Sequence, residues 1–73
     1  MKISVKSYSG YKADERPVKF WIGERAFFVE SIEDQWRGTD SVYFCVHTDD
    51  GKTYVLRHSE TTDEWTLEKS SQP

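Results

Sequence analysis

The sequence contains a single cysteine, Cys45, so the chain cannot form an internal disulfide. Cys45 lies within an alternating apolar segment, which favours a packing thiol over a redox or nucleophilic one. The sequence also lacks an apolar stretch long enough to span a membrane, and its first residues lack the apolar core of a signal peptide. We therefore expect a cytoplasmic protein that makes no membrane contact.

Basic residues are not in excess. Ten lysines and arginines stand against 13 aspartates and glutamates, which gives a formal net charge of −3. A general binder of the phosphate backbone needs a basic stripe, so this balance disfavours nucleic acid as a partner without excluding a local basic patch.

Signatures of catalysis and cofactor binding are also missing. The sequence has no phosphate-binding loop and no nucleophile–base arrangement. His47 and His58 lack the cysteine or carboxylate spacing of a zinc site, and the predicted strands point them to opposite faces, His47 outward and His58 inward. We expect no enzyme activity, no metal and no cofactor.

Aromatic residues, by contrast, are abundant, at 15% of the sequence. Helical periodicity is absent, and short segments that alternate apolar and polar residues are separated by turn signals. This pattern predicts one all-β domain over residues 1–73, a small antiparallel meander that forms an open barrel or roll of five to six strands, SH3-like in size. We expect its core within residues 16–68, an N-terminal strand and connector over residues 1–15, and a frayed tail over residues 69–73.

The first predicted hairpin is centred on Gly23-Glu24, which suits a two-residue type II′ turn. This turn pairs Ile22 with Arg25 and therefore Phe20 with Phe27. Side chains alternate between faces along a strand, so one face is assigned to the core: Val18, Phe20, Phe27 and Val29. The opposite face consists of Lys19, Trp21, Ala26 and Phe28. A half-buried hairpin is expected to be polar on that face, so its Trp and Phe mark a candidate contact surface.

The second predicted hairpin has two alternative loops around Asp49-Asp50-Gly51. A two-residue loop would place Arg57 opposite a core residue, Phe44. A three-residue loop with a left-handed Gly51 bulge pairs Phe44 with Leu56 instead, and we favour it because it keeps the arginine out of the core. In this register the side chains that point inward are Val42, Phe44, Val46, Tyr54 and Leu56. Those that point outward are Tyr43, Cys45, His47, Thr53, Val55 and Arg57.

The remaining segments are less regular. Residues 2–8 alternate as a strand, Pro17 is expected to open the next strand, and residues 64–68 form a closing strand. Residues 33–36 fit either a bent strand or one helical turn. A bulge near Glu30-Ser31 would return Ile32 to the core.

The sequence resembles a known family of small domains. The resemblance lies at Pro17, Phe20-Trp21, Gly23, Phe28-Val29, Ile32, Trp36, Tyr43-Phe44, Val46, Asp50-Gly51, Tyr54-Val55-Leu56-Arg57 and Trp65-Thr66-Leu67. The family is a small bacterial domain of unknown function, found alone or appended to larger proteins. Some members lie beside or at the end of Y-family DNA polymerase-like proteins. The resemblance covers residues 16–68 and implies a fold, but no catalytic residues.

Two functional hypotheses follow. The first is a protein-interaction module whose partner is an unidentified protein, a second copy of the chain included. Its predicted surface consists of Lys19, Trp21, Phe28, Tyr43 and Arg57. The alternative is a nucleic-acid-binding accessory domain linked to DNA repair or replication. There, bases would stack on Trp21, Trp36 or Tyr43, and phosphates would bind Lys19, Arg25, Arg37 and Arg57. Against both stands the interpretation that the N-terminal strand, with Ile3, Val5 and Tyr8, covers the Trp21 and Phe28 face.

Overall fold

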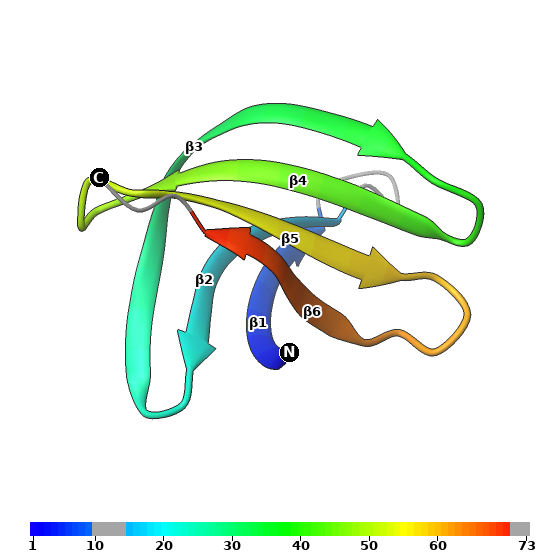
Figure 1. Cartoon of the computed structure of the whole chain (residues 1–73), viewed down its shortest axis with the longest axis horizontal. Helices are drawn as coiled ribbons and strands as arrows, with labels where there is room; N and C mark the ends of the chain where they lie inside the picture. The colour runs from blue at the N-terminus through cyan, green and yellow to red at the C-terminus, as the bar shows by residue number, and fades with distance from the viewer. Residues whose placement is uncertain (10–14, 71–73) are drawn as a thin grey trace.

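The computed structural model describes residues 1–9 and 15–70, which form a closed barrel of six antiparallel strands in sequence order (Figure 1). The strands are β1 (Lys2–Ser9), β2 (Glu15–Ile22), β3 (Arg25–Arg37), β4 (Ser41–Thr48), β5 (Thr53–Ser59) and β6 (Trp65–Ser70). The predicted all-β meander is confirmed, and pairing of β6 with β1 closes it. Residues 1–9 and 15–70 contain no helix long and apolar enough to cross a membrane.

The first hairpin has the predicted register, with Ile22 opposite Arg25 and Phe20 opposite Phe27. Gly23 has a φ of 64°, whereas Glu24 keeps a negative φ. A type II′ turn requires a positive φ at its first central residue only, so glycine is needed at position 23. Phe20 and Phe27 are both buried, as predicted.

The prediction that Val18 belongs to the core is wrong, because Val18 is 39% exposed. Lys19 pairs with Lys6 and Pro17 pairs with Ser7, so Val18 is an extra residue at a bulge. The bulge reverses the alternation of faces and buries the ring of Pro17 in place of Val18. Pro17 therefore lies inside β2 rather than opening it, at a bulge that tolerates its missing backbone donor.

β3 connects the two halves of the barrel. It pairs with β2 through Arg25–Phe28 and with β4 from Val29 to Arg37, and it bends between these parts (Figure 1). Its pairing with β4 skips Glu30 and Glu33, which makes two bulges. The first confirms the predicted bulge and lets Ile32 pack against the core. Residues 33–36 belong to the strand, so the helical alternative is wrong.

The second hairpin also has the predicted three-residue loop, with Phe44 opposite Leu56 and Val46 opposite Tyr54. Gly51 has a φ of 82°, and its N–H donates to the Thr48 carbonyl at 3.0 Å. All five residues predicted to point inward are buried, and all six predicted to point outward are half-buried.

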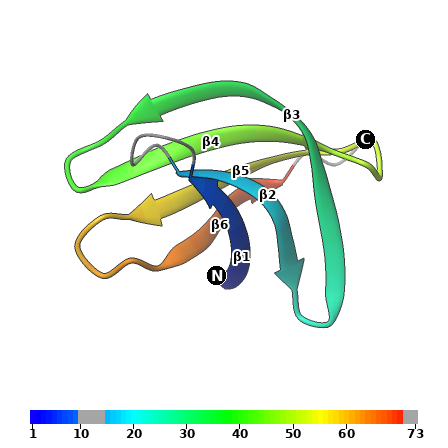
Figure 2. The same cartoon turned by 180° about the vertical axis from the view of Figure 1, so that it is seen from behind.

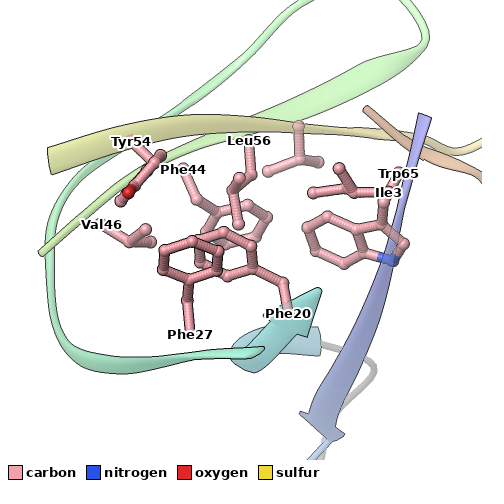
Figure 3. Packing of buried hydrophobic residues seen from close by; sticks show 9 residues of the cluster. Ile3, Phe20, Phe27, Phe44, Val46, Tyr54, Leu56 and Trp65 are labelled. Atoms are coloured by element: carbon pink, nitrogen blue, oxygen red, sulfur yellow. The ribbon is translucent and has the colours of Figure 1, made fainter. Parts of the chain in front are cut away.

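The buried core consists of Ile3, Phe20, Phe27, Val42, Phe44, Val46, Tyr54, Leu56 and Trp65 (Figure 3). At one end the Phe20 ring stacks on Phe27, with centroids 5.2 Å apart, and meets Tyr54 edge-on at 5.4 Å. At the other end Trp65 lies against Phe44. The core extends beyond residues 16–68, because Ile3 from β1 belongs to it. β6 also continues through Lys69 and Ser70, two residues of the expected tail; residues 71–73 and 10–14 lie outside the described part.

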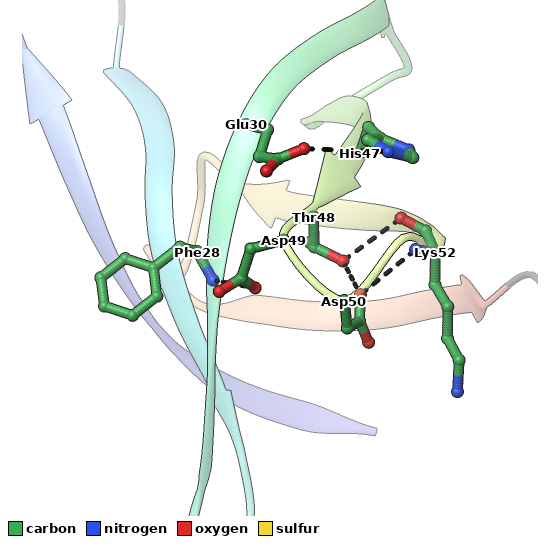
Figure 4. A network of polar contacts seen from close by, with 7 residues as sticks. All are labelled: Phe28, Glu30, His47, Thr48, Asp49, Asp50 and Lys52. Atoms are coloured by element: carbon green, nitrogen blue, oxygen red, sulfur yellow. Dashed lines mark hydrogen bonds and ion pairs between the residues drawn. The ribbon is translucent and has the colours of Figure 1, made fainter.

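A carboxylate holds the β4–β5 loop together (Figure 4). Asp50 Oδ1 accepts hydrogen bonds from the Thr48 hydroxyl and from the Lys52 N–H, and Asp50 Oδ2 accepts one from the Tyr54 hydroxyl at 3.0 Å. The Thr48 hydrogen bond, followed by those from Tyr54 and Lys52, lowers the pKa of Asp50 despite partial desolvation. The pKa of Tyr54 is raised, first by burial and then by its bond to Asp50.

This loop predicts an acid-dependent loss of stability. The folded-state pKa of Asp50 lies below its unfolded value, so its contribution is present above the unfolded pKa and is lost as pH falls through the folded pKa. We expect an Asp50→Asn variant to lose stability at neutral pH but to depend less on pH below about pH 4. Urea unfolding at intervals from about pH 7 to about pH 2.5 measures this. Parallel acid profiles for the two proteins would contradict the assignment.

Candidate interaction surfaces

The five residues predicted to form one surface lie in two groups, separated by the bend in β3. Lys19, Trp21 and Phe28 lie together on the β2–β3 hairpin, whereas Tyr43 and Arg57 are cross-strand partners on β4 and β5. The prediction of one contiguous surface assumed that both hairpins lie in one gently curled sheet. Trp36, the β3 residue opposite Tyr43, lies about 26 Å farther along the strand than Phe28, beyond the bend.

The first group, which we call the Lys19 cluster, consists of Lys19, Trp21 and Phe28. Lys19 Nζ lies 5.0 Å from the Trp21 ring centroid and 4.6 Å from the Phe28 ring centroid, so one ammonium group contacts two aromatic faces. Phe28 is 50% exposed. Its backbone is fixed by Asp49, whose N–H donates to the Phe28 carbonyl at 3.0 Å and whose Oδ1 accepts from the Phe28 N–H at 3.3 Å (Figure 4).

The N-terminal strand does not cover this cluster. β1 lies beside β2 and reaches β6 at its start (Figure 2). Ile3 is buried in the core and Val5 packs against it, so the apolar side of β1 is used inside the barrel. Tyr8 is exposed. The alternative that β1 forms a second core over Trp21 and Phe28 is therefore wrong.

The second group belongs to a larger surface that we call the Trp36 face, the outer side of the sheet formed by the end of β3 with β4, β5 and β6. Cross-strand pairing aligns its residues in two rows. One row is Trp36, Tyr43, Arg57 and Thr66. The other row is Asp34, Cys45, Val55 and Lys69.

Trp36 and Tyr43 stack on one another on this face. Their ring centroids are 5.4 Å apart and their planes differ by 3°, while Trp36 remains 43% exposed. A Cβ at Gly38 would lie 3.0 Å from Tyr43 Cε1, so glycine at position 38 leaves room for the tyrosine ring. The stack is therefore shaped by the turn next to it as well as by the strands.

The turn beside the stack is itself anchored. The Gly38 N–H donates to the Ser41 carbonyl at 2.8 Å, and the Glu60 N–H donates to the Asp40 carbonyl at 2.8 Å. Arg37 Nη1 lies 2.7 Å from Glu60 Oε1. The contacts of Glu60 join the β3–β4 turn to the β5–β6 loop, and this restricts the movement of the turn beside the aromatic pair.

Cys45 lies in the middle of the Trp36 face and is half-buried. Desolvation raises the pKa of its thiol, and the charges of Glu33 and Asp34 raise it further. A raised pKa disfavours the thiolate, which is the reactive form. This agrees with Cys45 as a packing residue.

The histidines lie where their strands predict. His47 points outward, with Nε2 3.9 Å from Glu30 Oε1. His58 is buried, stacks on Trp65 at 4.4 Å, and places Nε2 2.8 Å from Asp63 Oδ1. Within residues 1–9 and 15–70, no group of three or more His, Cys, Asp or Glu could hold a metal ion.

A pocket of about 270 Å³ lies between β2 and β3, lined by Arg16, Ile32, Asp34 and Gln35. This lining combines one positive and one negative side chain without a nucleophile. Its polar side chains can make hydrogen bonds and ion pairs.

The predicted protein-interaction surface does not include Trp36, although the structure places Trp36 next to Tyr43. Its position opposite Tyr43 depends on two bulges in β3, and only the bulge at Glu30 leaves a signal in the apolar pattern.

Comparison of the chain with protein-family models, with curated proteins and with solved structures found no match, so the resemblance to the bacterial domain associated with polymerases stays a prediction.

Proposed function

We propose that this protein is a non-enzymatic protein-interaction module and that it binds its partner through the Trp36 face. The observation that carries the proposal is the Trp36–Tyr43 stack, in which a tryptophan is held in one orientation and yet is 43% exposed. Arg57 lies next to Tyr43 in the same row. Trp, Tyr and Arg are the residue types that dominate binding hot spots.

The rigidity of this face favours binding. Ordering a flexible side chain at an interface costs about 0.5–1.5 kcal/mol. Stacking against Tyr43 and the braced turn restrict Trp36 before a partner arrives, so less ordering is left to binding.

Nucleic acid is the second candidate, because an exposed tryptophan beside an arginine can also stack on bases. The charges argue against it. Asp34 lies on the same face, the net charge is −3, and the Lys19 ammonium already contacts two rings. We therefore rank a protein partner first.

The test uses peptides, because the natural partner is unidentified. Peptides selected from a phage-displayed random library against the whole chain are titrated into ¹⁵N-labelled protein. We expect the Trp36 indole, Tyr43 and Arg57 resonances to shift, and a Trp36→Ala variant to bind at least about 30-fold more weakly, the loss typical of a hot spot.

The matched control is Phe28→Ala, which removes an exposed ring from the Lys19 cluster and should leave peptide binding unchanged. Shifts confined to the Lys19 cluster would contradict the assigned surface. An oligo-dT strand that binds at low salt, with an affinity that falls steeply as salt is added, would favour the nucleic-acid candidate instead.

A further inference from the structure

We propose that the partner of the Trp36 face is a second copy of the same chain, packed face to face in a two-fold symmetric dimer. This inference rests on the proposed function, since it names the partner of the same surface. It comes from the register of β3, β4, β5 and β6, which makes the face complementary to itself.

The symmetry argument is geometric. Two identical faces can meet face to face when the two-fold axis lies in the plane between them. An axis parallel to the strands and between β4 and β5 places β4 over β5 of the second copy and β3 over its β6. Each residue then lies over the residue of its own row on the opposite side of the axis.

The charges agree with this arrangement. In one row Asp34 on β3 lies over Lys69 on β6 of the second copy, and symmetry makes this ion pair twice. In the other row Tyr43 lies over Arg57 of the second copy, a pairing of an aromatic ring with a guanidinium group. Both pairings thus bring together groups that attract one another.

The centre of the contact is apolar. Cys45 lies over Val55 of the second copy, again twice, and both side chains are half-buried in the monomer. Desolvation raises the pKa of the Cys45 thiol, which favours its neutral form in an apolar contact. At the edge of the contact, Trp36 lies over Thr66 of the second copy. Glu68 accepts a hydrogen bond from the Thr66 hydroxyl within each chain. In the dimer its carboxylate is also an acceptor for the indole N–H of Trp36.

The size of the face sets the expected affinity. Four strands are about 19 Å wide and the two rows span about 13 Å along them, so the face covers about 250 Å², which is small beside a standard interface of about 800 Å² per partner. We expect a dissociation constant on the order of 0.1 mM, so the dimer forms at high concentration and the monomer prevails when dilute.

Sedimentation equilibrium of the whole chain at low salt, from about 10 µM to about 1 mM, tests this. The mass should rise from 8.6 kDa toward twice that value. Asp34→Lys alone sets lysine against Lys69 at both symmetric sites, and Lys69→Asp alone sets aspartate against Asp34. Each should weaken the dimer about tenfold, and the double variant should restore it to within about threefold.

Thermal unfolding of the three variants shows that they remain folded, so a loss of dimer is not a loss of structure. A chain that stays monomeric at about 1 mM while selected peptides still bind the Trp36 face overturns the dimer and leaves the proposed function standing. A dimer insensitive to the single changes, or one that the double variant does not restore, overturns this arrangement. Peptide shifts away from the Trp36 face overturn both proposals.

Discussion

A Phe20→Ala variant is expected to lose about 3–5 kcal/mol of its free energy of unfolding. Phe20 is 0% exposed and contacts both Phe27 and Tyr54 through its ring, so its removal leaves a cavity that β2 and β3 cannot fill. A domain of 73 residues is expected to be stable by only about 4–11 kcal/mol. The variant should therefore be close to unfolding, as measured by urea titration.

Phe28→Ala is the matched control, since it removes the same side chain from the paired strand on the opposite face. Phe28 is half exposed and contacts Lys19, so we expect a loss below about 1 kcal/mol. Equal losses for the two variants would contradict the register of the first hairpin.

The second large effect is expected for Trp65→Ala, which should also cost about 3–5 kcal/mol. Trp65 pairs with Ile3 across the seam that closes the barrel, stacks on His58 and contacts Phe44. The seam is short, with two paired positions and a hydrogen bond from the Leu67 N–H to the Met1 carbonyl at 2.7 Å. We therefore expect β1 to open first.

Hydrogen exchange separates this seam opening from global loss of structure. In the Trp65→Ala variant, β1 amides should exchange faster than β4 amides by a larger factor than in the wild type. Trp36→Ala is the control, because the Trp36 side chain lies on the outer face of the barrel and its stack on Tyr43 contributes only about 0.5–1.5 kcal/mol. Uniform acceleration of both strands by Trp65→Ala would argue that the seam is not a separate unit.

The two hairpins could be predicted from sequence because their information is local. Gly23 defines a tight turn, and the cost of burying Arg57 selects the longer loop at Gly51. Once the turn is known, alternation places every side chain of the two strands on a face.

The errors lie where pairing depends on distant strands. Val18 turns outward because β1 pairs with Pro17 and Lys19 and leaves Val18 as an extra residue. The local signal is Pro17, which fits the start of a strand as well as a bulge. The predicted surface divides for the same reason. β3 leaves β2 after Phe28 and joins β4, so Tyr43 gains Trp36 as a neighbour instead of Phe28.

This division also explains how a small barrel can use aromatic residues in two ways. Phe20, Phe27, Phe44 and Trp65 supply the core, whereas Trp36 and Tyr43 remain outside on strands that the same core holds in place. Substitutions in the core should therefore change stability first. Substitutions on the Trp36 face should change binding first.

The most direct test of this account is ¹⁹F NMR of protein labelled with 5-fluorotryptophan, which gives one resonance for each of the three tryptophans. In dilute protein a soluble gadolinium chelate should broaden Trp36 most, Trp21 less and Trp65 least. Raising the protein concentration or adding a selected peptide should then protect and shift Trp36. If Trp36 stays unchanged while Trp21 moves, the working surface lies on the Lys19 cluster and the account is wrong.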